Sequence, residues 1–152
     1  MKSDPLITYR RKPATLDTAS LESFAETLRD RVARGREFHC RITNDAELQT
    51  LNGRFLGRDY PTDVLSFPSG TESAHVGDLA VSLQRARVQA REWSHTLEDE
   101  IRILMLHGVL HLLGMDHESD DGRMRRAELR WRRKFGLPNG LIERSGTDDS
   151  QK

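Results

Sequence analysis

Short segments of alternating or continuous apolar residues predict four β-strands. Phe38, Cys40 and Ile42 alternate with the polar residues His39 and Arg41, which is the two-residue period of a strand with one buried face. The other three segments are apolar runs of the length that strands usually have. The predicted strands are 6–10, 38–42, 64–67 and 79–81.

A second pattern, with apolar residues three or four positions apart, predicts helices between these strands. It covers 21–32, where Gly35 follows as a helix terminator, and 83–93. Asn44 predicts the start of another helix, because its side chain can cap a helix and Glu47 follows at the third helical position. Strands and helices arranged in this way predict a single α+β domain.

The most apolar segment of the chain, 101–113, predicts a central helix. Its residues are apolar on nearly all sides of a helix, so we expect the helix to be buried. Thr96 and Asp99 form a capping pattern at its start. Glu98 and Glu100 add negative charge to its first turn, which favours a helix N-terminus.

The composition is that of one small soluble enzyme. The chain has 152 residues, 32% charged and 36% hydrophobic, which fits a domain at 1–144 and a disordered polar tail at 145–152. No apolar run is long enough to span a bilayer, and no apolar stretch after Met1–Pro5 indicates a secretion signal. Cys40, the single cysteine, excludes an internal disulfide and fits a core position in a cytoplasmic protein.

Three histidines within and just after the central helix indicate a metal site. His107 and His111 project from one face of a helix, and Gly114 can reverse the chain so that His117 returns as a third ligand. Three imidazoles leave one position open on a tetrahedral ion, which is typical of a catalytic zinc site. Chance placement of three core histidines is the alternative, but it needs a rare coincidence in a chain with six His. We expect one Zn²⁺ per chain.

Gly108 separates this segment from the metzincin peptidases, which share its histidine spacing. Those enzymes read H-E-x-x-H, and their Glu takes a proton from the zinc-bound water. With Gly108 at that position, the nearest acids are Asp116 and Glu118. Asp116 is the candidate catalytic acid. It is either a replacement base or, as its place beside a ligand favours, the acceptor of a ligand's ring N–H.

A run of arginines after the histidines predicts a basic helix. Between Arg123 and Lys134 the only acid is Glu128. Because guanidinium groups bind phosphate in a bidentate way, this helix is a candidate phosphate-binding surface for a nucleic acid. The alternative is an ordinary solvated helix face. The candidate RNA-binding residues on it are Arg123, Arg125, Arg126 and Arg130.

Four motifs together resemble the YbeY endoribonucleases of bacteria. They are H-G-V-L-H-L-L-G-M-D-H at 107–117, P-T-D-V-L-S-F-P at 61–68, G-D-L-A-V-S at 77–82 and E-S-D-D at 118–121, the last followed by Met124 and Glu128. The resemblance implies a single domain with a mixed four-stranded sheet, about five helices and a zincin-like metal helix. It also assigns the metal to His107, His111 and His117.

The resemblance further implies a function. Such a protein is a zinc-dependent hydrolase that cuts single-stranded RNA, matures the 3′ end of small-subunit rRNA and takes part in ribosome quality control. Its partners are single-stranded rRNA and the small ribosomal subunit in the cytoplasm, with neither a membrane nor DNA expected.

One position departs from the family pattern. Its members have Tyr-Arg-Gly-Lys-Asp before the P-T-D motif, and that Arg is thought to act in the RNA site. The run here is Phe55–Asp59, with Leu56 at the matching position. Arg58 is the candidate catalytic cation that compensates, and Arg54 is a further candidate RNA contact. The alternative is that both arginines are solvent-facing.

Two other functions remain open from the sequence. A metallopeptidase would need a displaced base, and a non-catalytic ribosome-binding factor would use zinc only as a structural ion. For a nuclease, either water or the RNA 2′-OH could be the nucleophile. His75 and His95 stand alone in polar contexts, so we expect them at the surface.

Overall fold

A four-stranded sheet forms the centre of the computed structural model, which describes residues 4–57, 62–70, 72–116, 119–142 and 144. The strand order is β1-β2-β4-β3; β1, β2 and β4 are parallel, whereas β3 is antiparallel to β4 at one edge. Each predicted strand overlaps one of these, and the predicted mixed sheet is confirmed. The strands are β1 (Ile7–Tyr9), β2 (Glu37–Thr43), β3 (Val64–Pro68) and β4 (His75–Ser82).

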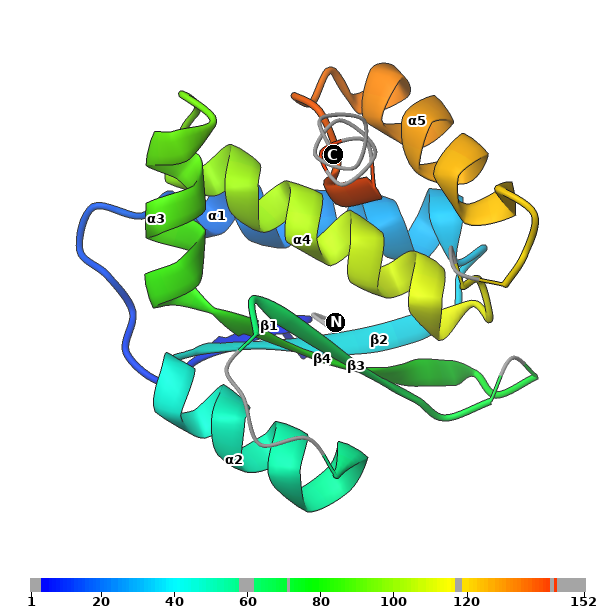
Figure 1. Ribbon diagram of the computed structural model, residues 1–152, viewed down its shortest axis with the longest axis horizontal. Coiled ribbons are helices and arrows are strands. Elements are labelled where there is room, and N and C mark those ends of the chain that lie inside the picture. Colours follow the sequence, from blue (N-terminus) through cyan, green and yellow to red (C-terminus); the bar gives the residue numbers. More distant parts are fainter. Residues whose placement is uncertain (1–3, 58–61, 71, 117–118, 143, 145–152) are drawn as a thin grey trace, which may run out of the picture.

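Helices cover both faces of this sheet (Figure 1). One face carries α2, and the other carries α1, α3 and α4, with α5 lying outside α4. The predicted helix over 21–32 is α-helical only at first, because α1 continues into a π-helical turn, η1, before Gly35 with its positive φ of 85°. The helices are α1 (Thr18–Thr27), η1 (Leu28–Val32), α2 (Asp45–Leu56), α3 (Leu83–Glu92), α4 (Leu97–Leu112) and α5 (Arg123–Phe135).

The central helix predicted from the apolar segment is α4. It begins as expected, because Thr96 Oγ1 accepts a hydrogen bond from the Asp99 N–H at 3.0 Å. Its apolar side chains are almost all buried against the sheet, α1, α3 and α5. This helix contributes more residues than any other element to one continuous core, and apolar area removed from water stabilises by about 25 cal/mol per Å². The helix is therefore a rigid support for the groups it carries.

Smaller expectations are also decided by the structure. Cys40 is fully buried on β2, and burial raises the pKa of its thiol to about 12, which confirms the core prediction. Asn44 caps α2 by accepting from the Glu47 N–H, but the Glu47 carboxylate binds Arg41 and Thr43 instead of closing a capping box. None of the described helices has the length and apolar character needed to cross a membrane. The predicted tail at 145–152 lies outside the described residues.

Candidate active site

α4 presents His107 and His111 one turn apart on one face, as their spacing predicts. The two imidazole rings are 4.8 Å apart between centroids and nearly perpendicular, at 77°. His107 is 8% exposed, so it lies at the boundary between the core and the surface. Two imidazoles held this close and on one side of a rigid helix are suitably placed to share one metal ion.

The ring of His107 is oriented by a carboxylate from another helix. Its Nδ1 donates to Glu128 Oε2 on α5 at 2.8 Å, and Glu128 is only 1% exposed. The other carboxylate oxygen, Oε1, accepts from the backbone N–H of Ile142 at 2.9 Å. Glu128 is thereby fixed from two sides. A hydrogen bond at Nδ1 assigns metal binding to Nε2 and makes the ring a better ligand.

His111 is oriented by the main chain that follows α4. Gly114 adopts a positive φ of 91°, the chain reversal that the sequence predicts at this position. The reversal brings the carbonyl oxygen of Met115 to His111 Nδ1 at 3.0 Å. Each of the two histidines thus uses Nδ1 for a structural hydrogen bond, so Nε2 is the atom through which either ring would bind a metal.

The residues present fit a zinc ion, although the third predicted ligand is not described. His117 lies outside the described residues, and among those described no group of three His, Cys, Asp or Glu is placed to hold a metal. The fit rests on the two rings, their spacing and their fixed Nδ1 atoms. Neutral imidazole is a common zinc ligand and a poor one for magnesium or calcium.

Glu128, which the sequence placed in a family motif without assigning it a role, makes the contact that was considered for Asp116. Asp116 is exposed, accepts from the Ser119 hydroxyl at 3.1 Å and lies on the turn after α4. Its predicted role next to His117 stays a prediction. A signal for Glu128 was present, because it lies four residues after Met124 on the apolar side of an otherwise basic helix.

Gly108 is required by the packing of α4 on the sheet. A Cβ at this position would come within 2.6 Å of Leu79 Cδ2 on β4, closer than nonbonded carbon atoms approach. The side chain of residue 108 would therefore point into the sheet. The Glu that serves as the base in metzincins has no room here, which argues against the metallopeptidase alternative.

An open cavity of about 780 Å³ lies beside His107. One wall is α3 with Arg85 and Gln89, followed by Trp93 at its C-terminal end, and Asp63 lines the cavity just before β3. Leu141, Ile142 and Arg144 line another side. A cavity of this volume, open to solvent and lined by one of the candidate metal ligands, can admit part of a polymeric substrate.

A buried charged cluster borders this cavity through Gln89 and Arg144, which line it. Glu100, on α4, is 0% exposed and forms a two-point ion pair with Arg144 at 2.8 and 3.0 Å. Glu100 also accepts from His95 Nε2 at 2.6 Å and from Gln89 at 3.0 Å. The His95 side chain is 7% exposed, so its predicted surface position was wrong. His75 is 44% exposed, as expected.

Comparison of the sequence with known proteins shows the family of this chain. The family model described as Endoribonuclease YbeY matches residues 7–136. The chain belongs to the YbeY family. It is 62% identical over 138 residues to Endoribonuclease YbeY of Solibacter usitatus (strain Ellin6076), covering 91% of this chain and 92% of that protein. It is 41% identical over 140 residues to Endoribonuclease YbeY of Koribacter versatilis (strain Ellin345), covering 92% and 91%.

A solved structure agrees with this assignment at the level of the fold. The solution structure of TM1509 from Thermotoga maritima superposes with a TM-score of 0.57 at 28% identity. The superposition covers 82% of this chain and 85% of that one. The sheet and helices described above are therefore shared with an experimentally determined structure.

The YbeY-motif region around Leu56 is only partly described. Arg58 lies outside the described residues, as does the rest of the loop at 58–61. Arg54 is exposed on the last turn of α2, where its guanidinium lies 5.7 Å from the Phe55 ring. Figure 1 places α2 on the opposite face of the sheet from α4. The structure thus does not bring Arg54 to the two histidines.

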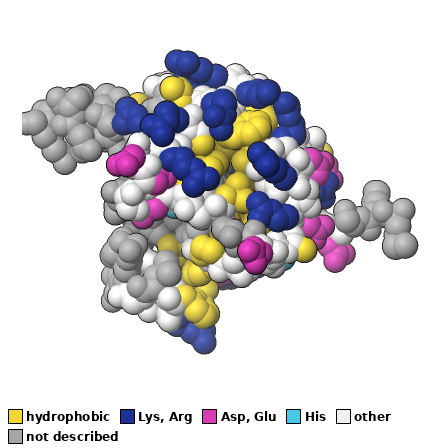
Figure 2. Space-filling view, turned by 90° about the vertical axis from the view of Figure 1, so that its right-hand side faces the viewer, with side chains coloured by type: hydrophobic (Ala, Val, Ile, Leu, Met, Phe, Trp, Pro, Cys, Tyr) yellow, Lys and Arg dark blue, Asp and Glu magenta, His cyan; other side chains and the backbone are white. Residues whose placement is uncertain are grey.

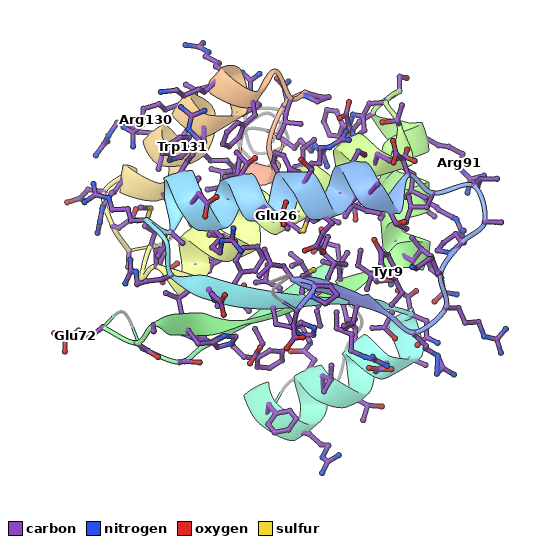
Figure 3. The ribbon with its side chains drawn as sticks, turned by 180° about the vertical axis from the view of Figure 1, so that it is seen from behind. Tyr9, Glu26, Glu72, Arg91, Arg130 and Trp131 are labelled. Atoms are coloured by element: carbon purple, nitrogen blue, oxygen red, sulfur yellow. The ribbon has the colours of Figure 1, made fainter. Side chains whose placement is uncertain are left out.

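The four candidate arginines of α5 lie on its solvent side. The buried residues of this helix, Met124, Ala127 and Glu128, face α4, and the arginines project outward. Figure 3 shows Arg130 pointing away from the rest of the molecule. Figure 2, which views the end of the molecule where α5 begins, shows Lys and Arg side chains with hydrophobic side chains between them. The predicted exposed basic helix is confirmed: Arg123, Arg125, Arg126 and Arg130 are all exposed.

Proposed function

We propose that this chain is a zinc-dependent endoribonuclease that cuts single-stranded RNA. Its substrate is rRNA of the small ribosomal subunit in the cytoplasm, and its product is the mature 3′ end. The observation that carries the proposal is the pair of imidazoles, each fixed through Nδ1, of which His107 lines an open cavity. Membership of the YbeY family supports the same activity.

The metal would be held by His107, His111 and, from its place in the motif, His117. When bound, Zn²⁺ supplies a Lewis acid that polarises a phosphoryl oxygen and lowers the pKa of bound water. The chain's own contribution is orientation. Glu128 fixes His107 and the Met115 carbonyl fixes His111, so both rings are placed before substrate arrives.

Charge on the transferring phosphate requires a cation from the protein. Arg58 is our candidate, because it is two residues from the position where the family has arginine. On this proposal Arg58→Ala lowers kcat/KM by about 2–4 kcal/mol of transition-state stabilisation, the usual cost of one preorganised donor. Arg54→Ala, across the sheet, is the matched control and should retain the parent rate.

The direct test is cleavage of a labelled single-stranded rRNA 3′-end fragment by zinc-loaded protein. We expect cleavage by the parent and by Glu26→Gln, an exposed carboxylate on α1 outside the cavity, and none by His111→Ala. His111→Ala should stay folded and bind zinc more weakly than the parent, which would tie its loss of activity to the metal site and not to unfolding. If the parent does not cleave the RNA, the result would contradict the nuclease and favour a ribosome-binding factor with structural zinc. Digestion of casein by the parent would favour the metallopeptidase instead.

The same assay identifies the nucleophile. A fragment with one 2′-deoxynucleotide at the cleaved position should resist cleavage if the RNA 2′-OH attacks, and should still be cut if water attacks. Single-stranded DNA serves as the fully deoxy control and should not be cleaved. Gly108 leaves no room for a metzincin-type base, so the RNA hydroxyl is the route we expect.

A further inference from the structure

A second cavity, of about 470 Å³, lies at the carboxyl ends of the parallel strands. The residues that follow β1, namely Arg10, Arg11 and Lys12, form one side of it. Arg87, on α3, forms another. Figure 1 shows that α2 and α3 both begin at this edge of the sheet, and Figure 3 shows Tyr9, the last residue of β1, at the same edge from behind.

The charge of this cavity has one sign. Four of its described lining residues are cations and none is acidic. The nearest carboxylates, Asp45 and Glu47 in the first turn of α2, already accept from Ser82 and Arg41. The α2 and α3 N-termini add positive partial charge to this edge. The cavity therefore has an electrostatic potential that attracts an anion.

The four cations differ from most other arginines that border the sheet. Arg41, Arg85, Arg102 and Arg144 each form a salt bridge with a carboxylate. No salt bridge within the described part of the chain involves Arg10, Arg11, Lys12 or Arg87; Lys12 instead lies 5.7 Å from the Tyr9 ring. Cations that the fold gathers around a cavity without a carboxylate are available to a phosphate group.

The basic cavity is joined to the candidate active site. Gln84, on the first turn of α3, lines both cavities, and the larger one extends from Gln84 along α3 to His107. The Gln84 side chain also accepts from the Asp45 N–H at 2.7 Å, which holds it on the ridge between them. A strand that crosses this ridge passes from the histidines to the cations.

We propose that the cavity formed by Arg10, Arg11, Lys12 and Arg87 binds a backbone phosphate of the same RNA strand whose scissile bond lies at His107. The proposal rests on the proposed function for the identity of the ligand. It gives the enzyme a second point of attachment, away from the cut, that reads charge and not sequence. The basic face of α5 is then not needed to hold this part of the strand.

The experiment compares two doubly neutralised variants in RNA binding. Arg11→Gln/Arg87→Gln removes one cation from each side of the cavity, and Arg31→Gln/Arg34→Gln removes two exposed arginines elsewhere. Fluorescence anisotropy with single-stranded RNAs of increasing length is measured at several salt concentrations on zinc-loaded protein. Zinc content is measured on each variant.

For long RNA we expect the cavity variant to bind roughly ten-fold more weakly, with the slope of log K against log salt smaller by about one. The control variant should match the parent, and the shortest RNA that binds should not distinguish the variants. Equal slopes and affinities for both variants at every length would overturn the proposal. Inorganic phosphate that binds in the cavity without weakening RNA binding would also overturn the proposal, because the cavity would then hold a free anion.

The binding readout separates this proposal from the proposed function. RNA that binds in the cavity but is never cut would contradict the nuclease and leave the phosphate site standing. RNA that is cut while the cavity variant binds it like the parent would contradict the site and leave the nuclease standing.

Discussion

Glu100 and Glu128 are both carboxylates in the protein interior, 0% and 1% exposed, and both accept a hydrogen bond from a histidine. Their remaining partners differ. Glu100 has the guanidinium of Arg144, which offsets its charge at two points, whereas the described partner on the other side of Glu128 is the main-chain N–H of Ile142. Glu100 belongs to an ion pair within the protein, whereas Glu128 accepts a hydrogen bond from a main-chain N–H group in place of a guanidinium.

The difference indicates what each carboxylate does. A buried charge is costly unless a countercharge or strong hydrogen bonds accompany it. Glu100 has its countercharge in the fold, so we assign it to stability. A zinc ion on His107 would bring positive charge close to Glu128, so we expect metal binding and the Glu128 interaction to strengthen each other.

The largest effect should come from breaking the Glu100 cluster. Glu100→Ala leaves the buried Arg144 and His95 side chains without their acceptor, and we expect a loss of about 3–5 kcal/mol in unfolding free energy. Urea denaturation measures it. In the double variant Glu100→Leu/Arg144→Met much of the loss should return, because no unpaired charge remains. A double variant as unstable as Glu100→Ala would contradict the ion-pair explanation.

Glu128→Gln should instead act on the metal. The amide keeps the shape but loses the charge that supports His107, so zinc affinity should fall about ten- to a hundred-fold in chelator competition. Zinc should also raise the melting temperature of this variant less than that of the parent. Glu92→Gln is the matched exposed control and should bind zinc like the parent. If Glu128→Gln binds zinc as tightly as the parent, the assignment of Glu128 to metal binding and of Glu100 to stability would be wrong.

Gly140→Ala tests whether the main-chain side of Glu128 matters. A Cβ at residue 140 would overlap the Glu128 carboxylate, so the carboxylate or the segment 140–142 must move. We expect about 1–2 kcal/mol of destabilisation and a several-fold weaker zinc affinity. Destabilisation with unchanged zinc affinity would show that the contact serves packing alone. Chelator competition and urea denaturation on the same samples give both values.

The smallest effect should come from the aromatic cover of the Glu100 cluster. The Arg144 guanidinium lies 5.0 Å from the Trp93 ring centroid, and Trp93 is 38% exposed. Trp93→Leu should cost about 0.5–1 kcal/mol in urea denaturation, the usual contribution of a cation–π contact near the surface. Zinc affinity should be unchanged. A loss as large as that of Glu100→Ala would mean that the ring, and not the ion pair, holds the segment.

The parts of the site that could be predicted are those determined by local sequence. The His107–His111 pair follows from helical periodicity, and the turn at Gly114 follows from the conformational freedom of glycine. The strands and helix starts followed from apolar periods and capping residues in the same way.

The parts that could not be predicted depend on how distant elements pack. Glu128 meets His107 only because α5 crosses α4, and no spacing rule relates residues on two helices. His95 stands in a polar stretch, yet Arg144 and Trp93 cover its surroundings and bury its side chain. The triplet Arg10–Lys12 is visible in the sequence, but its proximity to Arg87 is a product of the parallel sheet.

The contact between Ile142 and Glu128 also has a consequence for biosynthesis. A ribosome releases His107 and His111 well before it releases residues 140–144, because the chain is made from the N-terminus. Until Ile142 emerges, Glu128 lacks this hydrogen bond. We therefore expect His107 to be fully fixed in orientation only after residue 142 has packed against Glu128, so that completion of the site follows the release of this segment and not of α4 alone.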